Sequence, residues 1–418
     1  MKIPGNSWSG SSIDISIDVF SIVRVLVCIE LIAITWAFAL VNLIEISLFT
    51  ISLVHAPFRR ELFKTICDIR SILVLVFLAW ILIGMTHGLA DFGSRWSELV
   101  SWRKLLLVPI ILTVFKDQKD CWQALNVFLY TGIVYAILFF LVSIFTDLVY
   151  VFGERERLIE NHATQSVWFS VCILILVSKI LVNKGVTALN IVHTGLILVF
   201  FYCIISSVGR SGYLFLLVST VTFALACASS TKWRLLSVSA LVLFIGLALV
   251  TGSHSHERIS AGIENFKNAT TSENNTSLGI RRVMWTNTIK IISQYPLMGT
   301  GSGSFADAYA ETVKDQTGWR AQNTDDPHQQ YLHIWAEHGI IGLFIFLLLI
   351  SAMASASKNR ILLALSLSLL AGTALNSLFN GHFSAFVEGR LFWILSSAIA
   401  ASSPSFLSPV YEYLIRKI

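Results

Sequence analysis

Residues 122–149, WQALNVFLYTGIVYAILFFLVSIFTDLV, decide the fold class of this chain. The run holds one charged residue, Asp147, and it exceeds the roughly 20 apolar residues that a helix needs to cross a bilayer. Similar runs lie on both sides of it, and together they predict about twelve transmembrane helices. We place these at about 16–36, 39–54, 71–90, 103–115, 122–149, 164–182, 189–207, 212–230, 235–251, 331–356, 361–380 and 385–401.

The composition agrees with an all-α polytopic membrane protein. Apolar residues make up 55% of the 418 positions and charged residues 13%, about half the charged share of a soluble domain. This excludes soluble, disordered and fibrous classes and leaves a single membrane domain over 1–418. The six cysteines lie in or beside apolar runs, so we expect no disulfide framework. The polar N-terminus lacks the features of a signal peptide, so we expect the first span to be retained.

The distribution of basic residues predicts the orientation. Half of the 30 Lys and Arg residues fall in the two ends and the short even-numbered gaps between spans, among them Arg59, Lys116, Lys232 and Lys358. The short odd-numbered gaps between the predicted spans hold few Lys and Arg residues. The positive-inside rule therefore places both termini in the cytoplasm. It places the long segment 252–330 outside.

That outside segment is far longer than an ordinary connection, and long loops in compact domains usually carry function. Its middle part, SLGIRRVMWTNTIKIISQYP, begins at the potential N-cap Ser277, has helical apolar spacing and stops at Pro296. We expect an amphipathic helix there. The following GTGSGS is not expected to bind nucleotide phosphates, because no strand precedes it and no GK[ST] follows.

Two arginine motifs are candidates for binding an anion. Arg210, in SSVGRSGYLF, stands between two apolar runs among small and hydroxyl residues, and a guanidinium fork suits phosphate. The alternative is an arginine that snorkels from the edge of a span. Arg281 and Arg282 open the predicted amphipathic helix, whose unpaired N–H groups also favour an anion. The alternative is a pair of solvated charges.

His328, in DDPHQQYLHIW, lies where the loop re-enters the membrane beside Asp325 and Asp326. A histidine with an acidic neighbour can act as a general base near neutral pH. The alternative is a surface histidine at a helix start. His328, His333 and His338 are five residues apart, which does not suit chelation from one helical face, so no metal site is expected.

Glu388 and Arg390, in EGRLFW, are two further charges beside an apolar run. Neighbours at i and i+2 do not share a helical face, so each should find a partner elsewhere. Arg210 and His328 are possible partners for Glu388. We favour a structural ion pair.

The segments SVGRSGYL, SLGIRRVMW with IISQYPLMGTGSGSF, DPHQQYLHIWAEHGIIG and NSLFN with EGRLFW follow one another around a long external loop. In this order they resemble the O-antigen ligase family, which belongs to a superfamily that also holds O-antigen polymerases. The motifs cover about 200–395. The resemblance implies a membrane-embedded, inverting, metal-independent glycosyltransferase of the GT-C type with no cofactor. It acts on the periplasmic side of the Gram-negative inner membrane, within a multi-pass chain.

In that family the donor is a glycan on undecaprenyl pyrophosphate and the acceptor is a sugar hydroxyl of lipid A-core. The resemblance implies Arg210 and Arg281 as essential arginines and His328 as the catalytic histidine. Arg282, Asp326, Tyr331 and Glu388 are expected to contact substrate. The family usually has Asn after the histidine, where Gln329 stands here. Membrane lipids are the expected surroundings, and nucleic acid is not an expected partner.

Two rival functions stay open at this stage. An O-antigen polymerase would use the same donor chemistry on a second lipid-linked repeat unit. A transporter or flippase for a lipid-linked glycan would line its path with charges such as Arg210 and Glu388. We find no inverted repeat or paired broken helices in the sequence, and the single large external loop favours an enzyme.

Overall fold

The computed structural model describes residues 18–145, 162–183, 187–207, 210–228, 239, 277–354 and 357–404, with the side chains of Arg210, Ser277 and Leu278 left out. All regular structure in these ranges is helical, which confirms the all-α class. The elements are α1 (Val19–Ala33), α2 (Phe38–Val54), α3 (Ala56–Ile66), α4 (Ile69–His87), α5 (Phe92–Trp102), η1 (Arg103–Leu106), α6 (Leu107–Val114), α7 (Gln118–Ile144), α9 (His162–Val182), α10 (Ala188–Ser206), α11 (Arg210–Cys227), α14 (Ser277–Gln294), α15 (Phe305–Val313), η3 (Gly318–Ala321), α16 (Gln330–Ala352), α17 (Arg360–Asn376) and α18 (Phe386–Ala400).

The protein is a polytopic membrane protein, but the expected number of spans is not confirmed. Among the described residues, five helices are long and apolar enough to cross a bilayer, namely α4, α7, α9, α10 and α16. A sixth span arises if α2 and α3, which meet at a bend of 95°, count as one. The expected span at 103–115 is instead η1 followed by the short α6, and the expected span at 235–251 lies outside the described residues.

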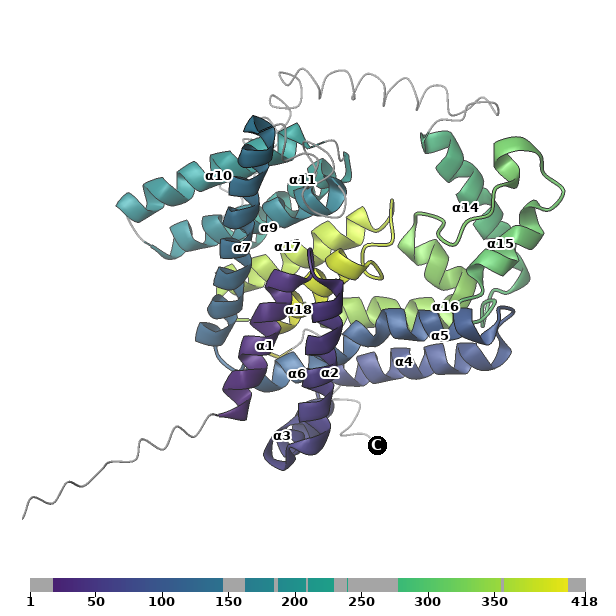
Figure 1. Ribbon diagram of the computed structural model, residues 1–418, viewed down its shortest axis with the longest axis horizontal. Coiled ribbons are helices and arrows are strands. Elements are labelled where there is room, and N and C mark those ends of the chain that lie inside the picture. Colours follow the sequence, from purple (N-terminus) through teal and green to yellow (C-terminus); the bar gives the residue numbers. More distant parts are fainter. Residues whose placement is uncertain are drawn as a thin grey trace, which may run out of the picture.

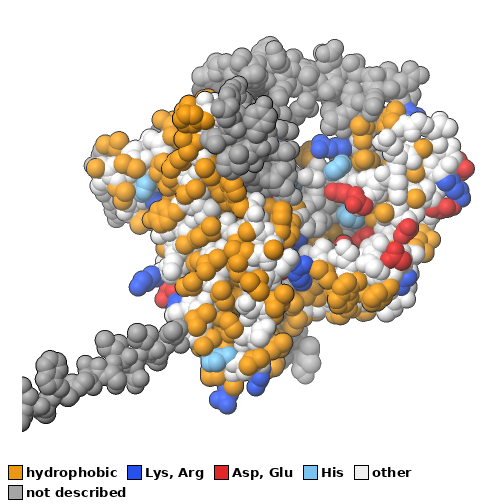
Figure 2. All heavy atoms as spheres, in the orientation of Figure 1, with side chains coloured by type: hydrophobic (Ala, Val, Ile, Leu, Met, Phe, Trp, Pro, Cys, Tyr) orange, Lys and Arg blue, Asp and Glu red, His pale blue; other side chains and the backbone are white. Residues whose placement is uncertain are grey.

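The core is centred on α18, whose residues from Val387 to Ala400 are all buried. Aromatic side chains fill the contacts around it, as in the stack of Phe128 on Trp168 with ring centroids 4.3 Å apart. The outer surface carries large apolar side chains, and Figure 2 shows them spread over the part of the molecule where α1, α2 and α7 lie. This surface fits lipid rather than water as the surrounding solvent.

Two charges inside the core are paired. The Arg390 guanidinium donates to Glu45, with Nε–Oε1 at 2.8 Å and Nη2–Oε1 at 2.7 Å, and it lies 3.8 Å from Glu30. Arg103 binds the other oxygen of Glu45 at 2.7 Å. This network confirms the expectation that Arg390 has a structural ion pair with a distant partner. It joins α1, α2 and η1 to α18.

A second group of helices stands beside this core. Figure 1 shows α16 running alongside α4 and α5, with α14 and α15 on the other side of its first turns. The α14 helix matches the predicted amphipathic helix at both ends, since it begins at Ser277 and stops two residues before Pro296. The α16 helix is kinked at Gly339, where φ is +67°. The segment 330–338 can therefore lean away from the rest of the span.

Candidate active site

The described residues enclose a cavity of about 590 Å³ between α5, the first turns of α16 and the loops that precede α15 and α18. In Figure 2, acidic and histidine side chains gather around a hollow in this part of the molecule. The titratable residues that line it are Glu98, Asp325, Asp326, His328, His333, Glu337 and His338. Three of the sequence candidates, Asp326, His328 and the neighbouring Asp325, thus meet at one cavity.

His328 occupies a backbone conformation that residues other than glycine seldom adopt. Its φ is +52°, and it is the only non-glycine with positive φ among the described residues. The Asp326 carboxylate holds this turn by accepting from the His328 N–H at 2.7 Å. Such a conformation costs roughly 1 to 3 kcal/mol and persists only where its surroundings fix it, often at functional sites.

One ring nitrogen of His328, Nδ1, faces two hydrogen-bond acceptors. It lies 3.3 Å from Asn380 Oδ1 and 3.6 Å from Asp326 Oδ2. These oxygens favour the tautomer that carries the proton on Nδ1, which leaves the Nε2 lone pair able to accept a proton. Asn380 comes from the loop between α17 and α18. It lies in the segment that carries the family resemblance, although no sequence pattern singled it out.

The loop around His328 is fastened to three elements. The Trp285 indole of α14 donates to Pro327 O at 3.0 Å, and the Gln330 N–H donates to Ser377 O at 3.0 Å. The Gln330 side chain accepts from the Ser384 N–H and hydroxyl at 3.1 and 3.0 Å. His328 therefore stands where α14, α16 and the α17–α18 loop converge.

Gln329, which replaces the usual Asn, serves as the N-cap of α16. Its Oε1 accepts from the Leu332 N–H at 2.6 Å. The side chain thus satisfies one of the free donors at the helix start. The departure from the family pattern has a local structural role here.

Two predicted substrate contacts have other partners. The Tyr331 hydroxyl donates to Ala374 O at 2.6 Å, so it ties α16 to α17, and Tyr331 is absent from the described lining of the cavity. Glu388 is buried, accepts from Thr164 and lies 3.5 Å from His382 Nδ1. These two residues take the place of the expected partner His328, while the side chain of Arg210, the other expected partner, lies outside the described residues. The sequence analysis did not select His382, which lies between the NSLFN and EGRLFW segments.

The arginines stand at helix starts. Arg210 opens α11, and the Gln165 amide of the neighbouring α9 donates to the hydroxyl of Ser207, the C-cap of α10, at 2.9 Å. Arg281 lies in the first turn of α14 and is half-buried, while Arg282 is exposed. Arg281 and Trp285 are four residues apart and share a face of α14. That face is the one that contacts Pro327 beside His328.

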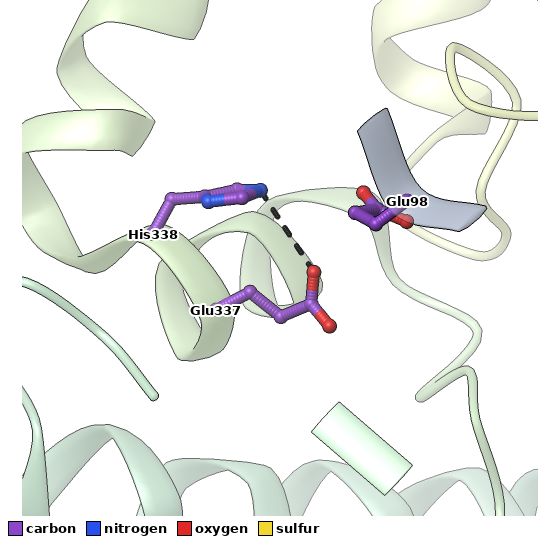
Figure 3. Close-up of side chains that lie close together, drawn as sticks. All are labelled: Glu98, Glu337 and His338. Carbon is purple, nitrogen blue, oxygen red and sulfur yellow. Dashed lines mark ion pairs between the residues drawn. The ribbon is translucent and has the colours of Figure 1, made fainter. Parts of the chain in front are cut away.

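A cluster missed from the sequence lies deeper in the same cavity. One oxygen or nitrogen atom from each of Glu98, Glu337 and His338 falls within 4.8 Å of the others, and Figure 3 shows the three side chains converging. Burial raises the pKa of Glu98 to about 7, with the charge of Glu337 adding to the effect. The Glu337 carboxylate also accepts from the Phe305 N–H at 3.0 Å. Such a set of atoms can hold a cation or a shared proton.

Comparison with known proteins agrees with the resemblance noted above. A family model described as O-antigen ligase matches residues 195–347. An O-antigen ligase of Salmonella typhimurium is 26% identical over 158 residues, which is 37% of each chain. An uncharacterized protein of Haemophilus influenzae is 35% identical over 120 residues, 26% of this chain and 28% of its own length. The matches thus span 37% and 28% of the length of these two relatives. Over residues 195–347 the chain carries a domain of the O-antigen ligase family.

Proposed function

We propose that this protein is an O-antigen ligase, which moves a polysaccharide from undecaprenyl pyrophosphate to a sugar hydroxyl of lipid A-core. The observation that carries the proposal is the placement of His328 on a polar cavity, with Nδ1 facing acceptors and Nε2 left to take a proton. The family match over 195–347 includes His328 and Arg281. The reaction takes place on the periplasmic side of the inner membrane.

The chemistry requires one proton acceptor and a means of stabilising the leaving group. The acceptor hydroxyl attacks the anomeric carbon, its proton passes to His328 Nε2, and the bond from that carbon to the pyrophosphate oxygen breaks. Attack from the opposite face inverts the anomeric centre. General-base assistance of this kind contributes about 10² to 10⁴ in rate.

The negative charge that grows on the pyrophosphate is matched by arginine. Arg281 lies on the face of α14 that contacts the His328 loop, and Arg210 opens α11. A guanidinium group can donate two parallel hydrogen bonds to phosphate oxygens, and these hydrogen bonds strengthen as charge develops in the transition state. Undecaprenyl pyrophosphate is already a good leaving group, so our proposal needs no metal and no nucleotide.

The direct test is transfer by purified protein in lipid nanodiscs. We expect glycan to move from undecaprenyl pyrophosphate to lipid A-core in the presence of EDTA and without nucleotide. Extension of one lipid-linked repeat by another, with lipid A-core left unmodified, would instead assign a polymerase. Loss of transfer with EDTA and recovery with added divalent cation would make Glu98, Glu337 and His338 a metal centre and contradict the metal-free mechanism.

His328→Ala should reduce the transfer rate by at least about 10²-fold, because the acceptor proton loses its base. Donor affinity should stay near that of the wild type, since the arginines remain. His333→Ala should be milder, and His87→Gln, at an exposed position on α4, serves as the matched control. Turnover close to normal in His328→Ala would remove this histidine from the mechanism.

A further inference from the structure

The α5 helix presents a polar stripe that the proposed mechanism does not use. Ser94, Ser97, Glu98 and Ser101 all line the cavity, and their spacing of three and four residues puts them on one face. On the other side of the helix, Phe92 is 71% and Trp96 53% exposed. The helix therefore separates an apolar surface, suited to lipid, from a row of hydroxyls and a carboxylate.

Close contacts fix α5 as a wall of the site. Asp91 caps it by accepting from the Ser94 N–H at 2.8 Å, and the Ala90 N–H just before the helix donates to Ser304 Oγ at 3.0 Å. At Gly303, where φ is +70°, an added Cβ would stand 2.5 Å from Ser94 O. The loop before α15 is thus pressed against the start of α5. The stripe is held opposite the first turns of α16.

The stripe offers groups that suit sugar hydroxyls. The Ser101 hydroxyl donates to Glu98 O at 2.8 Å and keeps its acceptor lone pairs. The Ser97 hydroxyl is exposed and makes no hydrogen bond within the described part of the chain. Hydroxyls and carboxylates together can both donate to and accept from a sugar. The cavity volume of about 590 Å³ lies within the range of small-molecule sites.

The charge of the cavity opposes a phosphate. Glu98, Asp325, Asp326 and Glu337 line it, and no lysine or arginine does so among the described residues. Three histidines share the space, and two of them, His333 and His338, each lie 3.8 Å from the Glu337 carboxylate. A pyrophosphate dianion would meet repulsion here. A neutral sugar or an amino sugar would not.

We propose that the serine and glutamate stripe of α5 forms the acceptor-sugar subsite, and that its carboxylate side selects sugars without phosphate. This rests on the proposed transfer reaction. The acceptor sugar lies in the α5–α16 cavity with its reacting hydroxyl at His328, and the donor pyrophosphate stays outside that cavity, toward α14. The α5 helix lies outside residues 195–347, which match the family model.

The test compares Ser97→Ala/Ser101→Ala and Glu98→Gln with wild type, with Val100→Ala, which is not among the cavity-lining residues, as the control. Each hydrogen bond lost corresponds to about 2- to 10-fold. The double serine variant should therefore raise the acceptor KM about tenfold and leave the donor KM unchanged. At pH 8, above the Glu98 pKa of about 7, wild type should prefer lipid A-core with an unphosphorylated terminal sugar over its phosphorylated form by about tenfold or more in kcat/KM, and Glu98→Gln should narrow that preference.

An increase in donor KM instead, unchanged KM values, or equal use of the phosphorylated acceptor would overturn the inference. A second measurement does not depend on transfer. Saturation-transfer NMR detects the binding of free core oligosaccharide to the protein. Absence of transfer by wild type would count against the proposed function alone. Oligosaccharide binding that wild type shows and the serine variant loses supports the subsite, whereas equal binding by both rejects it.

Discussion

Arg281 and Arg282 are adjacent in sequence but stand on different faces of α14. Arg282 shares its stripe with Thr286, Ile289 and Ser293, all exposed, while Arg281 shares its own with Trp285 and the buried Thr288. Successive helical residues are turned by about 100°. This rotation directs the two guanidinium groups to different sides of the helix.

Arg281→Lys should therefore lose about 10- to 100-fold in transfer, because lysine keeps the charge but not the paired hydrogen bonds. Arg210→Lys should behave in the same way. Arg282→Lys should stay within about twofold of wild type. Transfer rate and donor affinity of all three variants at matched expression are the measurements. Damage confined to Arg282→Lys would mean that the other face of α14 binds the donor.

Glu98 should make stability depend on pH. Its pKa in the folded protein is raised to about 7 from 4.5, mainly by burial. Between these values the folded state holds the proton that the unfolded state has lost, so stability falls as the pH rises from about 4.5 to 7. The melting temperature of wild type in detergent should drop over this range by a few degrees. Glu98→Gln should show a flatter profile, and a parallel one would exclude Glu98 as the cause.

At the scale of helices, the apolar pattern predicted which helices exist better than it predicted where they begin and end. The predicted 277–295 helix corresponds to α14, which has Ser277 as its first residue rather than as its N-cap and ends two residues before Pro296. The prediction of a span at 103–115 was wrong, because Arg103 and Lys104 make buried polar contacts instead of lying at the bilayer surface. The polar stripe of α5 was visible in the sequence as serines and a glutamate at helical spacing. Its meaning depends on α16, more than 200 residues away, which no local pattern reveals.

The glycines of the loop between α14 and α15 allow this loop to lie directly against the end of α4. Gly301 has φ of +92°, and an added Cβ would stand 2.3 Å from Gly88 Cα at the end of α4. Since backbone lies on both sides of the contact, no side chain can move to relieve it. The loop supplies hydrogen bonds there as well, with the Leu89 N–H donating to Thr300 O at 3.3 Å.

Gly301→Ala should cost about 2 to 4 kcal/mol, as overpacking adds to the strain of a positive φ. Gly318→Ala is the matched control, because its φ of +65° carries the strain while nothing lies within 4 Å of an added Cβ. It should cost about 1 kcal/mol. Gly195→Ala, in open space on α10, should be neutral or slightly stabilising. Thermal unfolding in detergent ranks the three, and equal losses for Gly301 and Gly318 would show that the loop does not press on α4.

At the scale of the whole molecule, the site joins residues inside and outside the range that matches the family model. The family match covers α10 to α16, which brings Arg281 and His328. Asn380 beside His328 and the α5 stripe come from outside that range. The motif could therefore predict the proton acceptor and the arginines. The residues that orient His328, and those that we propose to select the acceptor, are brought together by the packing of the entire fold.

The orientation of this fold in the membrane is predicted by its basic residues and gains internal support from the structure. The gap at 90–103 and the segment at 252–330 are assigned to the same side, and residues 89–94 indeed contact residues 300–304. Lys119 and Cys67, both exposed, belong to gaps on the opposite side. If that side is the cytoplasm, the cavity opens to the periplasm.

Thiol labelling of intact cells with an impermeant maleimide tests this directly. In a Cys67→Ser background, Ser293→Cys on the exposed face of α14 should be labelled from outside, because serine and cysteine are nearly isosteric and the position is open. Lys119→Cys should react only after the inner membrane is broken. The native Cys67 alone is a second inside probe that needs no substitution, since the other five cysteines are buried or half-buried. Labelling of Lys119→Cys and Cys67 in intact cells, with Ser293→Cys protected, would invert the topology and place the cavity, with His328, in the cytoplasm, where a periplasmic ligase reaction could not occur.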